Sequence, residues 1–332
     1  SGSDLETSAK AKFKAEVSQK GKVLVPGRLL AEISRSLPAK PVTFNLEGSR
    51  VLVSAGSAKF TLPTLPLVEY PTLPELPSAS GSLNSDLFAT AVNQVAIAAG
   101  KDDSLPTLTG VFVEINKNQI TLAATDRYRL AVRELTWNAQ DANIETTSLL
   151  RARTLADAAK SLIGSSQVTI ALAPTTTNEK LVGFISEGKT MTSRVLDGSF
   201  PPFRHLLPSE STADAVIEVA PFLDSVRRVA LVTDKTVPLR LKFSDNSLHL
   251  EAGAGDEATA TEELQISYTG EAIDIAFNPT FLADGLNALG TTYVNIAFTG
   301  SNKPAVLSGK NKIDGEIDSS YRYLLMPMRY AS

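Results

Sequence analysis

Hydrophobic and polar residues alternate along much of this chain, in short segments that are typical of antiparallel strands. In residues 8–17 the charged side chains occupy even positions and the apolar ones occupy odd positions. A period of two puts one kind of side chain on each face of a sheet, so this segment predicts a half-buried strand. The same pattern predicts strands near 41–46, 50–54, 57–63, 108–115, 119–124, 167–173, 237–243, 247–252 and 293–298.

A helical period interrupts the strands at intervals. Apolar residues recur on one face of each such segment, and charged or small residues occupy the other face. With several strands between successive helices, the pattern predicts an α+β fold. The amphipathic helices are predicted near 27–37, 86–99, 152–163, 221–233 and 280–289.

The predicted helices contain an internal repeat. Leu-Ala followed by an acidic residue occurs in 28–33, 153–158 and 280–285. A second family of helices, with Phe as its second residue, occurs in 87–92 and 221–226 and alternates with the first. We therefore expect a chain built of helix-plus-strand units, two of them in each domain.

Proline-rich segments mark the predicted domain boundaries. Residues 70–77 and 200–208 have similar composition and are interpreted as equivalent exits from successive domains. They predict three repeated domains, at 1–78, 79–209 and 210–332. By this count the first domain contains only its second unit, so its first half is expected to be absent.

Composition excludes several classes of protein. The 332 residues include no Cys, which excludes a disulfide scaffold, an iron–sulfur protein, a thiolate nucleophile and a zinc–thiolate site. No apolar run approaches the roughly 18 residues of a membrane span, and residues 1–20 show no secretory signal. We therefore expect a cytoplasmic protein. The net charge of −4 means that binding to nucleic acid would need basic residues gathered on one surface.

The remaining chemistry of the sequence favours a protein without a catalytic site. His205 and His249 stand alone, and the Gly-x-Ser-x-Gly pattern of a nucleophile elbow is absent. No phosphate-binding loop is present, and Gly253-Ala254-Gly255 lacks the third glycine of a dinucleotide site. We expect no enzyme activity, no metal and no cofactor.

Four motifs occur in a fixed order along the chain, together with the repeat. They are Ala124–Val132, Asp197–Pro201, Ala276–Pro279 and Tyr323–Arg329. In this combination the chain resembles the bacterial sliding clamp, the beta subunit of the replicative DNA polymerase III. The resemblance implies a subunit of three clamp domains that dimerises head to tail into a closed ring, with helices lining the hole and sheets outside.

The resemblance also implies a function and a set of partners. A clamp of this family encircles duplex DNA without sequence preference and tethers the replicative polymerase as a processivity factor. Its further partners are the clamp loader, other DNA polymerases and repair proteins, which bind through short apolar peptide motifs. No membrane contact is implied. The alternative interpretation is a multidomain β-rich scaffold that binds peptides but not DNA.

Basic residues on the outward faces of three predicted helices are expected to face the DNA. Ordinary solvation of exposed helix faces is the alternative for each helix taken singly. A sparse basic lining suits a ring that must slide, because many phosphate contacts would slow its movement. The predicted DNA-facing residues are Arg28, Arg35, Arg153, Lys160, Arg227 and Arg228.

The resemblance further implies an apolar peptide groove between the second and third domains. The alternative is that residues 324–328 form an ordinary core strand, in which alternation separates Leu325 from Leu324, Met326 and Met328. The family often has Gly-His where this chain has Arg127-Tyr128, and often Arg in place of His205. The matched groove residues are Leu108, Thr125, Tyr128, Arg129, Leu130, Pro201, His205, Leu206, Leu324, Met326, Pro327 and Met328, with Asn278 and Phe281 at the rim.

The last implied surface closes the ring. The outer edge of the first domain is expected to meet the third domain of a neighbouring subunit, with strands 57–63 and 257–267 facing each other as otherwise unpaired edges. Lys59 and Arg50 on one surface would face glutamates on the other. The predicted interface residues are Ile33, Phe60, Leu231, Val232, Glu257, Glu262 and Glu263.

Overall fold

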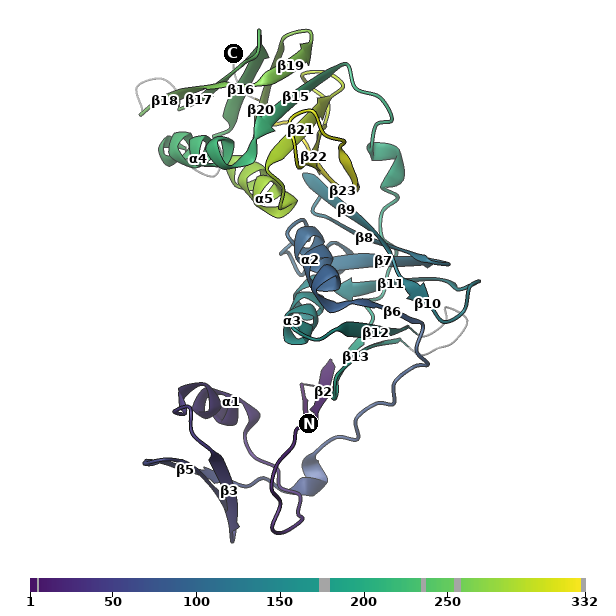
Figure 1. The fold of residues 1–332 in the computed structure, drawn as a ribbon, viewed down its shortest axis with the longest axis vertical. Coiled ribbons are helices and arrows are strands. Elements are labelled where there is room, and N and C mark those ends of the chain that lie inside the picture. The colour runs from purple at the N-terminus through teal and green to yellow at the C-terminus, as the bar shows by residue number, and fades with distance from the viewer. Residues whose placement is uncertain (5, 173–179, 234–236, 254–257, 330–332) are drawn as a thin grey trace. The chain divides into compact units, whose positions relative to one another are not determined.

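The computed structural model describes the chain except for residues 5, 173–179, 234–236, 254–257 and 330–332. It divides into two compact units (Figure 1). The first unit contains residues 1–76 and 188–192, and the second contains residues 77–187 and 193–332.

In the first unit one helix packs on a three-stranded antiparallel sheet. The helix is α1 (Gly27–Ser36), and the sheet has the order β3 (Val42–Glu47), β4 (Arg50–Ala55), β5 (Ala58–Pro63). Ile33 of the helix is buried in a cluster with Val51, Val53 and Leu62. The remaining elements are β1 (Gly2–Ser3), β2 (Thr7–Ala11) and the 3-10 turn η1 (Leu67–Glu69).

The strand predicted over 8–17 is shorter in the structure. It ends at Ala11, and residues 12–17 are exposed and form no strand. Phe13 and Val17, which alternation assigned to a buried face, are largely exposed. Alternation produces a strand only where a core receives the apolar face, and no core receives these two side chains.

The second unit repeats a pair of helices beside antiparallel strands. Its helices are α2 (Ser85–Ala96), α3 (Ala152–Leu162), α4 (Val219–Val229) and α5 (Pro279–Leu289), with 3-10 turns η2 (Pro106–Thr109), η3 (Arg204–Leu206) and η4 (Ala230–Val232). Contacts join α2 to α3, α4 to α5 and α2 to α5. The side chain of Gln94 on α2 donates to the carbonyl of Ala288 on α5, at 2.9 Å.

A nine-stranded sheet is the main β structure of this unit. Its order is β11 (Glu145–Arg151), β7 (Gly110–Asn116), β8 (Gln119–Thr125), β9 (Arg129–Thr136), β23 (Asp318–Leu325), β22 (Ala305–Lys310), β21 (Tyr293–Phe298), β15 (Ala213–Glu218) and β19 (Ser267–Gly270). Strands β9 and β23 pair antiparallel, with Leu130 opposite Leu324. This pairing, called the seam below, joins chain segments that are far apart in sequence.

Two further sets of strands complete the unit. A four-stranded sheet has the order β18 (Ala260–Gln265), β17 (Ser247–Ala252), β16 (Leu239–Ser244) and β20 (Ile273–Phe277). The other set has the order β13 (Leu181–Ser186), β12 (Gln167–Leu172), β6 (Gly81–Asn84) and β10 (Asn138–Ala139). Strand β14 (Lys189–Arg194) lies mostly in the first unit.

The repeated residues of the helices are packing positions. Leu155 of α3 and Leu282 of α5 are buried, as are Phe88 of α2 and Phe222 of α4. All five predicted helices are present, although the one predicted over 221–233 ends at Val229 and continues as η4. The predicted α+β class is confirmed. No helix among the described residues has the length and apolar character needed to cross a bilayer.

Candidate functional site

The turn between β8 and β9 is held by short polar side chains. Asp126 Oδ1 accepts the backbone N–H groups of Tyr128 at 3.0 Å and Arg129 at 3.1 Å. Thr125 Oγ1 donates to the carbonyl of Arg129 at 2.7 Å and accepts from the N–H of Arg127 at 3.1 Å. Arg127 has a φ of 81°, a left-handed conformation that costs a residue other than glycine free energy. The turn presents Tyr128, which is 59% exposed.

Arg129 and Leu130 lie on opposite faces of the nine-stranded sheet. Successive residues of a strand point to opposite faces, and Leu130 packs in a buried cluster to which Arg129 does not belong. Arg129 is only 5% exposed and makes its contacts with α5 and β23. The place of Arg129 among the groove residues stays a prediction.

Arg129 is the centre of a polar cluster beneath the turn. Its Nε donates to Asp126 Oδ2 at 2.9 Å, and its Nη1 donates to Asp284 Oδ2 of α5 at 2.7 Å. Its guanidinium carbon lies 4.1 Å from the centre of the Phe281 ring. Burial alone would lower the pKa of Arg129. The interaction with Tyr323 and the hydrogen bonds to Asp284 and Asp126 outweigh burial and raise that pKa, so the side chain stays charged.

The hydroxyl of Tyr323 links the same cluster to the backbone of α5. It accepts from Arg129 Nη1 at 3.4 Å and donates to the carbonyl of Phe281 at 2.9 Å. Burial raises the pKa of Tyr323, so the hydroxyl keeps its proton at neutral pH. Phe281, predicted at the groove rim, thus packs on Arg129 at the helix face of the seam.

Leu130 and Leu324 form a buried floor on the other face of the seam. Each is 1% exposed, and they pack with Phe203 in one cluster. Phe112 and Phe200 stack above this cluster, with ring centres 5.3 Å apart. The aromatic residues of the 200–203 segment pack against Leu130 and Leu324, whose place in the groove stays a prediction.

A hollow of about 380 Å³ opens above this floor. It is lined by Phe112 and residues 200–205, which include the predicted Pro201 and His205. Beyond the last strand pair, Leu325 opposite Arg129, the N–H of Met326 donates to the Tyr128 carbonyl at 2.9 Å. We call the hollow together with Tyr128 and Met326 the apolar groove.

The other residues predicted for the groove differ in exposure. Leu206 is exposed and follows His205, whereas Leu108 is buried. Pro327 and Met328 are half-buried, as is Thr125 in the turn described above. Leu206 and Met326 are therefore the predicted aliphatic side chains most available to a ligand.

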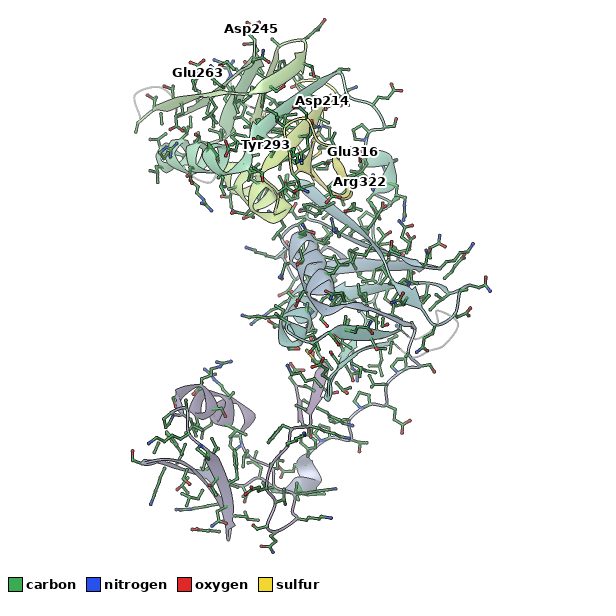
Figure 2. All side chains as sticks on the ribbon, viewed as in Figure 1. Asp214, Asp245, Glu263, Tyr293, Glu316 and Arg322 are labelled. Carbon is green, nitrogen blue, oxygen red and sulfur yellow. The ribbon has the colours of Figure 1, made fainter. Side chains whose placement is uncertain are left out.

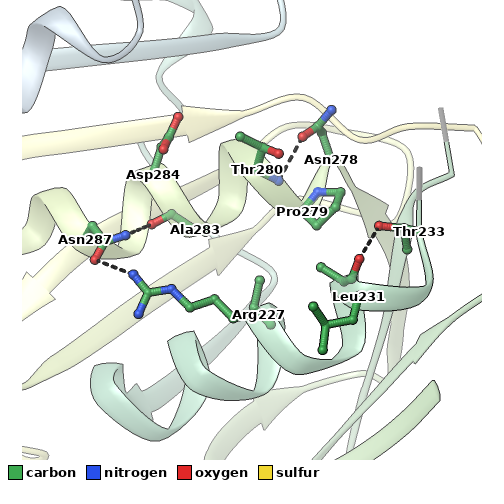
Figure 3. A pocket seen from close by; sticks show the side chains of 11 residues that line it. Arg227, Leu231, Thr233, Asn278, Pro279, Thr280, Ala283, Asp284 and Asn287 are labelled. Carbon is green, nitrogen blue, oxygen red and sulfur yellow. Dashed lines mark hydrogen bonds between the residues drawn. The ribbon is translucent and has the colours of Figure 1, made fainter. Parts of the chain in front are cut away.

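A second and larger hollow lies between α4 and α5 (Figure 3). It has a volume of about 740 Å³ and is lined by Arg227 and Leu231 on one side and by Asn278 and Asn287 on the other. Asn278 caps α5, since its Oδ1 accepts the N–H of Thr280 at 2.9 Å and that of Phe281 at 3.1 Å. The structure thus places Asn278 in this hollow and not in the lining of the one beside Pro201.

The predicted DNA-facing residues of α1 and α3 lie on exposed helix surfaces. Arg28 pairs with Glu32 at 3.1 Å, one helical turn away. Arg35, Arg153 and Lys160 are exposed, and none of them forms an ion pair within the described part of the chain. Their charges are therefore available to an external anion.

The two arginines of α4 have different surroundings. Arg227 donates to Asn287 of α5 at 3.3 Å and remains exposed (Figure 3). Arg228 Nε donates to Glu262 of β18 at 2.8 Å, and this hydrogen bond lowers the pKa of Glu262. The charge of Arg228 is therefore largely neutralised within the domain, as is that of Glu262.

On the first of the two predicted interface surfaces, Ile33 is a core residue. It is buried against the sheet of the first unit, where Phe60 is half-buried on the same cluster. The contact of Ile33 with a neighbouring subunit stays a prediction. Strand β5, which carries Phe60 and Lys59, is an edge of its sheet.

The second predicted interface surface contains a prominent apolar side chain. Leu231 in η4 is 83% exposed, and its neighbour Val232 is half-buried. Glu263, labelled in Figure 2, is exposed on the edge strand β18 and accepts from the hydroxyl of Ser247 at 2.6 Å. Glu257 lies outside the described residues.

Within the described residues, the side chains do not gather into a metal site. No group of three or more His, Asp or Glu side chains is arranged to hold an ion there. His205 lines the smaller hollow, and His249 is half-buried on β17.

Family models of the DNA polymerase III beta subunit match the chain in three consecutive stretches. The N-terminal domain matches residues 1–74, the central domain 82–202 and the C-terminal domain 204–329. The expectation that half of the first domain is absent is not supported, since the N-terminal model matches residues from the first onwards.

Relatives and solved structures agree with these models. The chain is 49% identical to the beta sliding clamp of Streptomyces coelicolor over 98% of this chain and 87% of the relative. A crystal structure of DNA polymerase III subunit beta from Pseudomonas aeruginosa is 26% identical, with a TM-score of 0.87 over 99% of this chain and 88% of that one. A sliding clamp from the same organism, solved with bound griselimycin, has the same TM-score at 27% identity and covers 99% of this chain and 87% of that one.

Proposed function

The chain belongs to the bacterial beta sliding clamp family, the DNA polymerase III beta subunits, and on that basis we propose that it tethers a replicative polymerase to duplex DNA. The subunits of this family are processivity factors and have no catalytic site. The observation that carries the proposal is the match of three clamp-domain models in order along the chain. It supports a clamp and not a β-rich scaffold without DNA binding. Such a factor acts on the bacterial chromosome, in the cytoplasm.

The proposed clamp is a homodimeric ring of head-to-tail subunits. The edge strand β5 belongs to the first unit, and the edge strand β18 belongs to the second. A head-to-tail contact joins two different surfaces of neighbouring subunits. It gives a closed ring only when the rotation from each subunit to the next leads back to the first subunit. Exposed Leu231 and half-buried Phe60 supply apolar contacts, and Lys59 would face Glu263.

The domain boundaries near residues 78 and 209 remain a prediction.

We propose that duplex DNA runs through the hole of this ring, which the helices line. Exposed Arg35, Arg153 and Lys160 carry charge that is available to phosphate, whereas exposed Arg227 lies 3.9 Å from Asp224 and Arg228 is held by Glu262. Phosphate contacts contain no sequence information, so a ring held by few of them can move along the duplex. We retain Arg28 as a weaker contact because Glu32 pairs with it.

The apolar groove is the proposed site for partner proteins. Tyr128, Leu206 and Met326 are exposed apolar side chains, and Phe112 with residues 200–205 lines a hollow above the floor of Leu130 and Leu324. Methionine adapts its shape at low cost, so one groove can accept different short apolar motifs. The clamp from Pseudomonas aeruginosa was solved with griselimycin, which makes this compound a suitable probe for the groove of the present chain. Polymerases, the clamp loader and repair proteins are its proposed natural occupants.

Replacing Leu231 with Glu is expected to weaken dimerisation by about 2 kcal/mol, because it puts a charge in the apolar centre of the proposed interface. Leu231 is 83% exposed, so folding of the subunit is expected to be unaffected. Sedimentation velocity over a concentration series measures the effect. Leu206→Glu is the matched control, since Leu206 is also exposed but lies beside the groove. The interface would be contradicted if the parent sediments as a monomer at every concentration. It would also be contradicted if the Leu231→Glu variant dimerises as tightly as the Leu206→Glu variant.

A further inference from the structure

Positive charge is concentrated in a short stretch of the first unit. Residues 10–22, called the lysine segment below, contain five lysines and a single acidic residue, Glu16, and so carry a net charge of +4 in a chain whose net charge is −4. All five lysines are exposed, and none of them forms an ion pair within the described part of the chain. They are Lys10, Lys12, Lys14, Lys20 and Lys22.

We propose that the lysine segment binds single-stranded DNA, at a surface separate from the helices of the proposed ring. The partner is defined by its chemistry, which is a row of phosphates for the lysines and an unstacked base for Phe13. The inference goes beyond the proposed clamp, because this contact needs neither a closed ring nor the apolar groove.

The spacing of the first three lysines suits a row of phosphates. Lys10 lies in β2 and Lys12 directly follows it, where the N–H of Lys12 donates to the carbonyl of Gly188 at 2.9 Å. In extended backbone, alternate residues lie roughly 6.6 Å apart on one side of the chain. Lysine is a point charge without a fixed fork of donors, so such a row binds a phosphate backbone and does not read its sequence.

Phe13 indicates a single strand as the partner. Its side chain is 82% exposed and has no ring contact among the described residues, and its two neighbours are Lys12 and Lys14. Surfaces that bind single strands combine positive charge with aromatic rings on which bases stack. Bases of a duplex are already stacked on one another, and an acidic peptide has no base to offer. Phe13 therefore favours single-stranded DNA over both.

Ordinary solvation of a charged stretch is the alternative interpretation. It accounts for the lysines, and a single exposed phenylalanine is also common on protein surfaces. The two interpretations differ in what the ring does: in a solvated stretch the ring of Phe13 contributes nothing to DNA binding, whereas in a single-strand site it contributes through stacking. The decisive experiment therefore changes the ring and the charges separately.

Fluorescence anisotropy of the full chain with a labelled oligothymidylate, measured over a salt series, tests the charges. Each phosphate contact with a single strand contributes about 0.7 to the slope of log K against log salt concentration. Reversing Lys10, Lys12 and Lys14 to Glu is therefore expected to lower the slope by about 2. The matched control reverses three exposed lysines of the second unit and should keep most of the slope. These are Lys117, Lys303 and Lys312.

Variants of Phe13 test the ring at constant charge. Phe13→Leu keeps an apolar side chain without a ring and is expected to weaken binding of the oligothymidylate about tenfold. Phe13→Tyr keeps the ring and should bind like the parent. Neither variant should change the binding of a labelled duplex. Phe13→Trp adds a local readout, because the new fluorescence should be quenched when the oligothymidylate stacks on it.

The results that would overturn the proposal leave the clamp to be judged separately. A parent that does not bind the oligothymidylate at low salt, or a Phe13→Leu variant that binds it like the parent, would overturn the single-strand site. Displacement by polyglutamate at equal charge concentration would also overturn it, since any polyanion would then suffice. So would an equal loss of binding when Arg153, Lys160 and Arg227 are reversed, because the strand would then lie on the helices.

Discussion

Replacing Leu324 with Ala is expected to lower the free energy of unfolding by about 3 kcal/mol, as large-to-small changes in well-packed cores do. Leu324 is 1% exposed and packs with Leu130, Phe203 and Val306. The cluster lies across the seam, so the cavity would open between strands that join two distant parts of the chain. Urea unfolding followed by the fluorescence of Trp137, which lies just beyond the end of β9, measures the change.

Met326→Ala is the control for this prediction. Met326 is two residues from Leu324 but is 39% exposed, so its truncation is expected to cost less than about 1 kcal/mol of stability. Both variants should bind griselimycin less tightly. Met326→Ala removes a contact with the ligand, and Leu324→Ala disturbs the packing of the groove floor. If Leu324→Ala unfolds at the same urea concentration as the parent, the side chain is not part of a packed core, and the description of the groove floor is wrong.

Reversing Arg153, Lys160 and Arg227 to Glu is expected to flatten the salt dependence of DNA binding. Each lost phosphate contact lowers the slope of log K against log salt concentration by about 0.9. If all three residues face DNA, the triple variant should lose about 3 units of slope and bind duplex DNA far more weakly at low salt. Fluorescence anisotropy of a labelled duplex, measured over a salt series, gives both quantities.

The matched control changes the net charge by the same amount at other positions. Lys117, Lys303 and Lys312 are exposed on loops between consecutive strands and belong to no helix. Their reversal should leave most of the slope in place, apart from a small effect of net charge. Equal losses in the two triple variants would show that overall charge and not a helical lining determines the binding. Arg228 is left unchanged because a Glu there would lie against Glu262.

The helices and the half-exposed strands could be predicted from the sequence because their pattern is local. Strands β4, β16 and β17 alternate buried and partly exposed residues, and each was predicted to within about two residues at either end. Several other strands were missed, among them β9 and β13, and also β15, although β15 alternates buried and half-buried residues over most of its length. Most residues of β9 and β13 are buried on both faces, which erases the period of two. A run of buried apolar residues does not show by itself whether it forms a strand.

The groove could be predicted only in part, because its shape depends on which face of each strand is covered. Alternation does separate Arg129 from Leu130, but only the pairing of β9 with β23 shows which of the two faces α5. Resemblance to a family supplies a set of matched residues, but it does not show which face of the sheet each side chain occupies. Ile33 illustrates the same limit, since an apolar residue on an amphipathic helix fits both a core and an interface until its neighbours are known.

The repeat predicted where helices occur and not what their polar residues do. Glu32, Asp157 and Asp284 occupy the same repeat position. Glu32 pairs with Arg28 on its own helix, Asp157 is exposed, and Asp284 holds Arg129 across the seam. The signal for the last role was the Asp126–Arg129 spacing in the Ala124–Val132 motif, and its partner on α5 could be found only in three dimensions.

The most direct test of the proposed function is whether the protein is linked to DNA by topology. The full chain is loaded onto a nicked circular plasmid by a clamp loader and separated from free protein by gel filtration, before and after the circle is cut once. A closed ring that slides should remain on the circle and be lost from the linear form, because it can leave a free end. Equal retention on both forms would show ordinary DNA binding and would contradict the clamp.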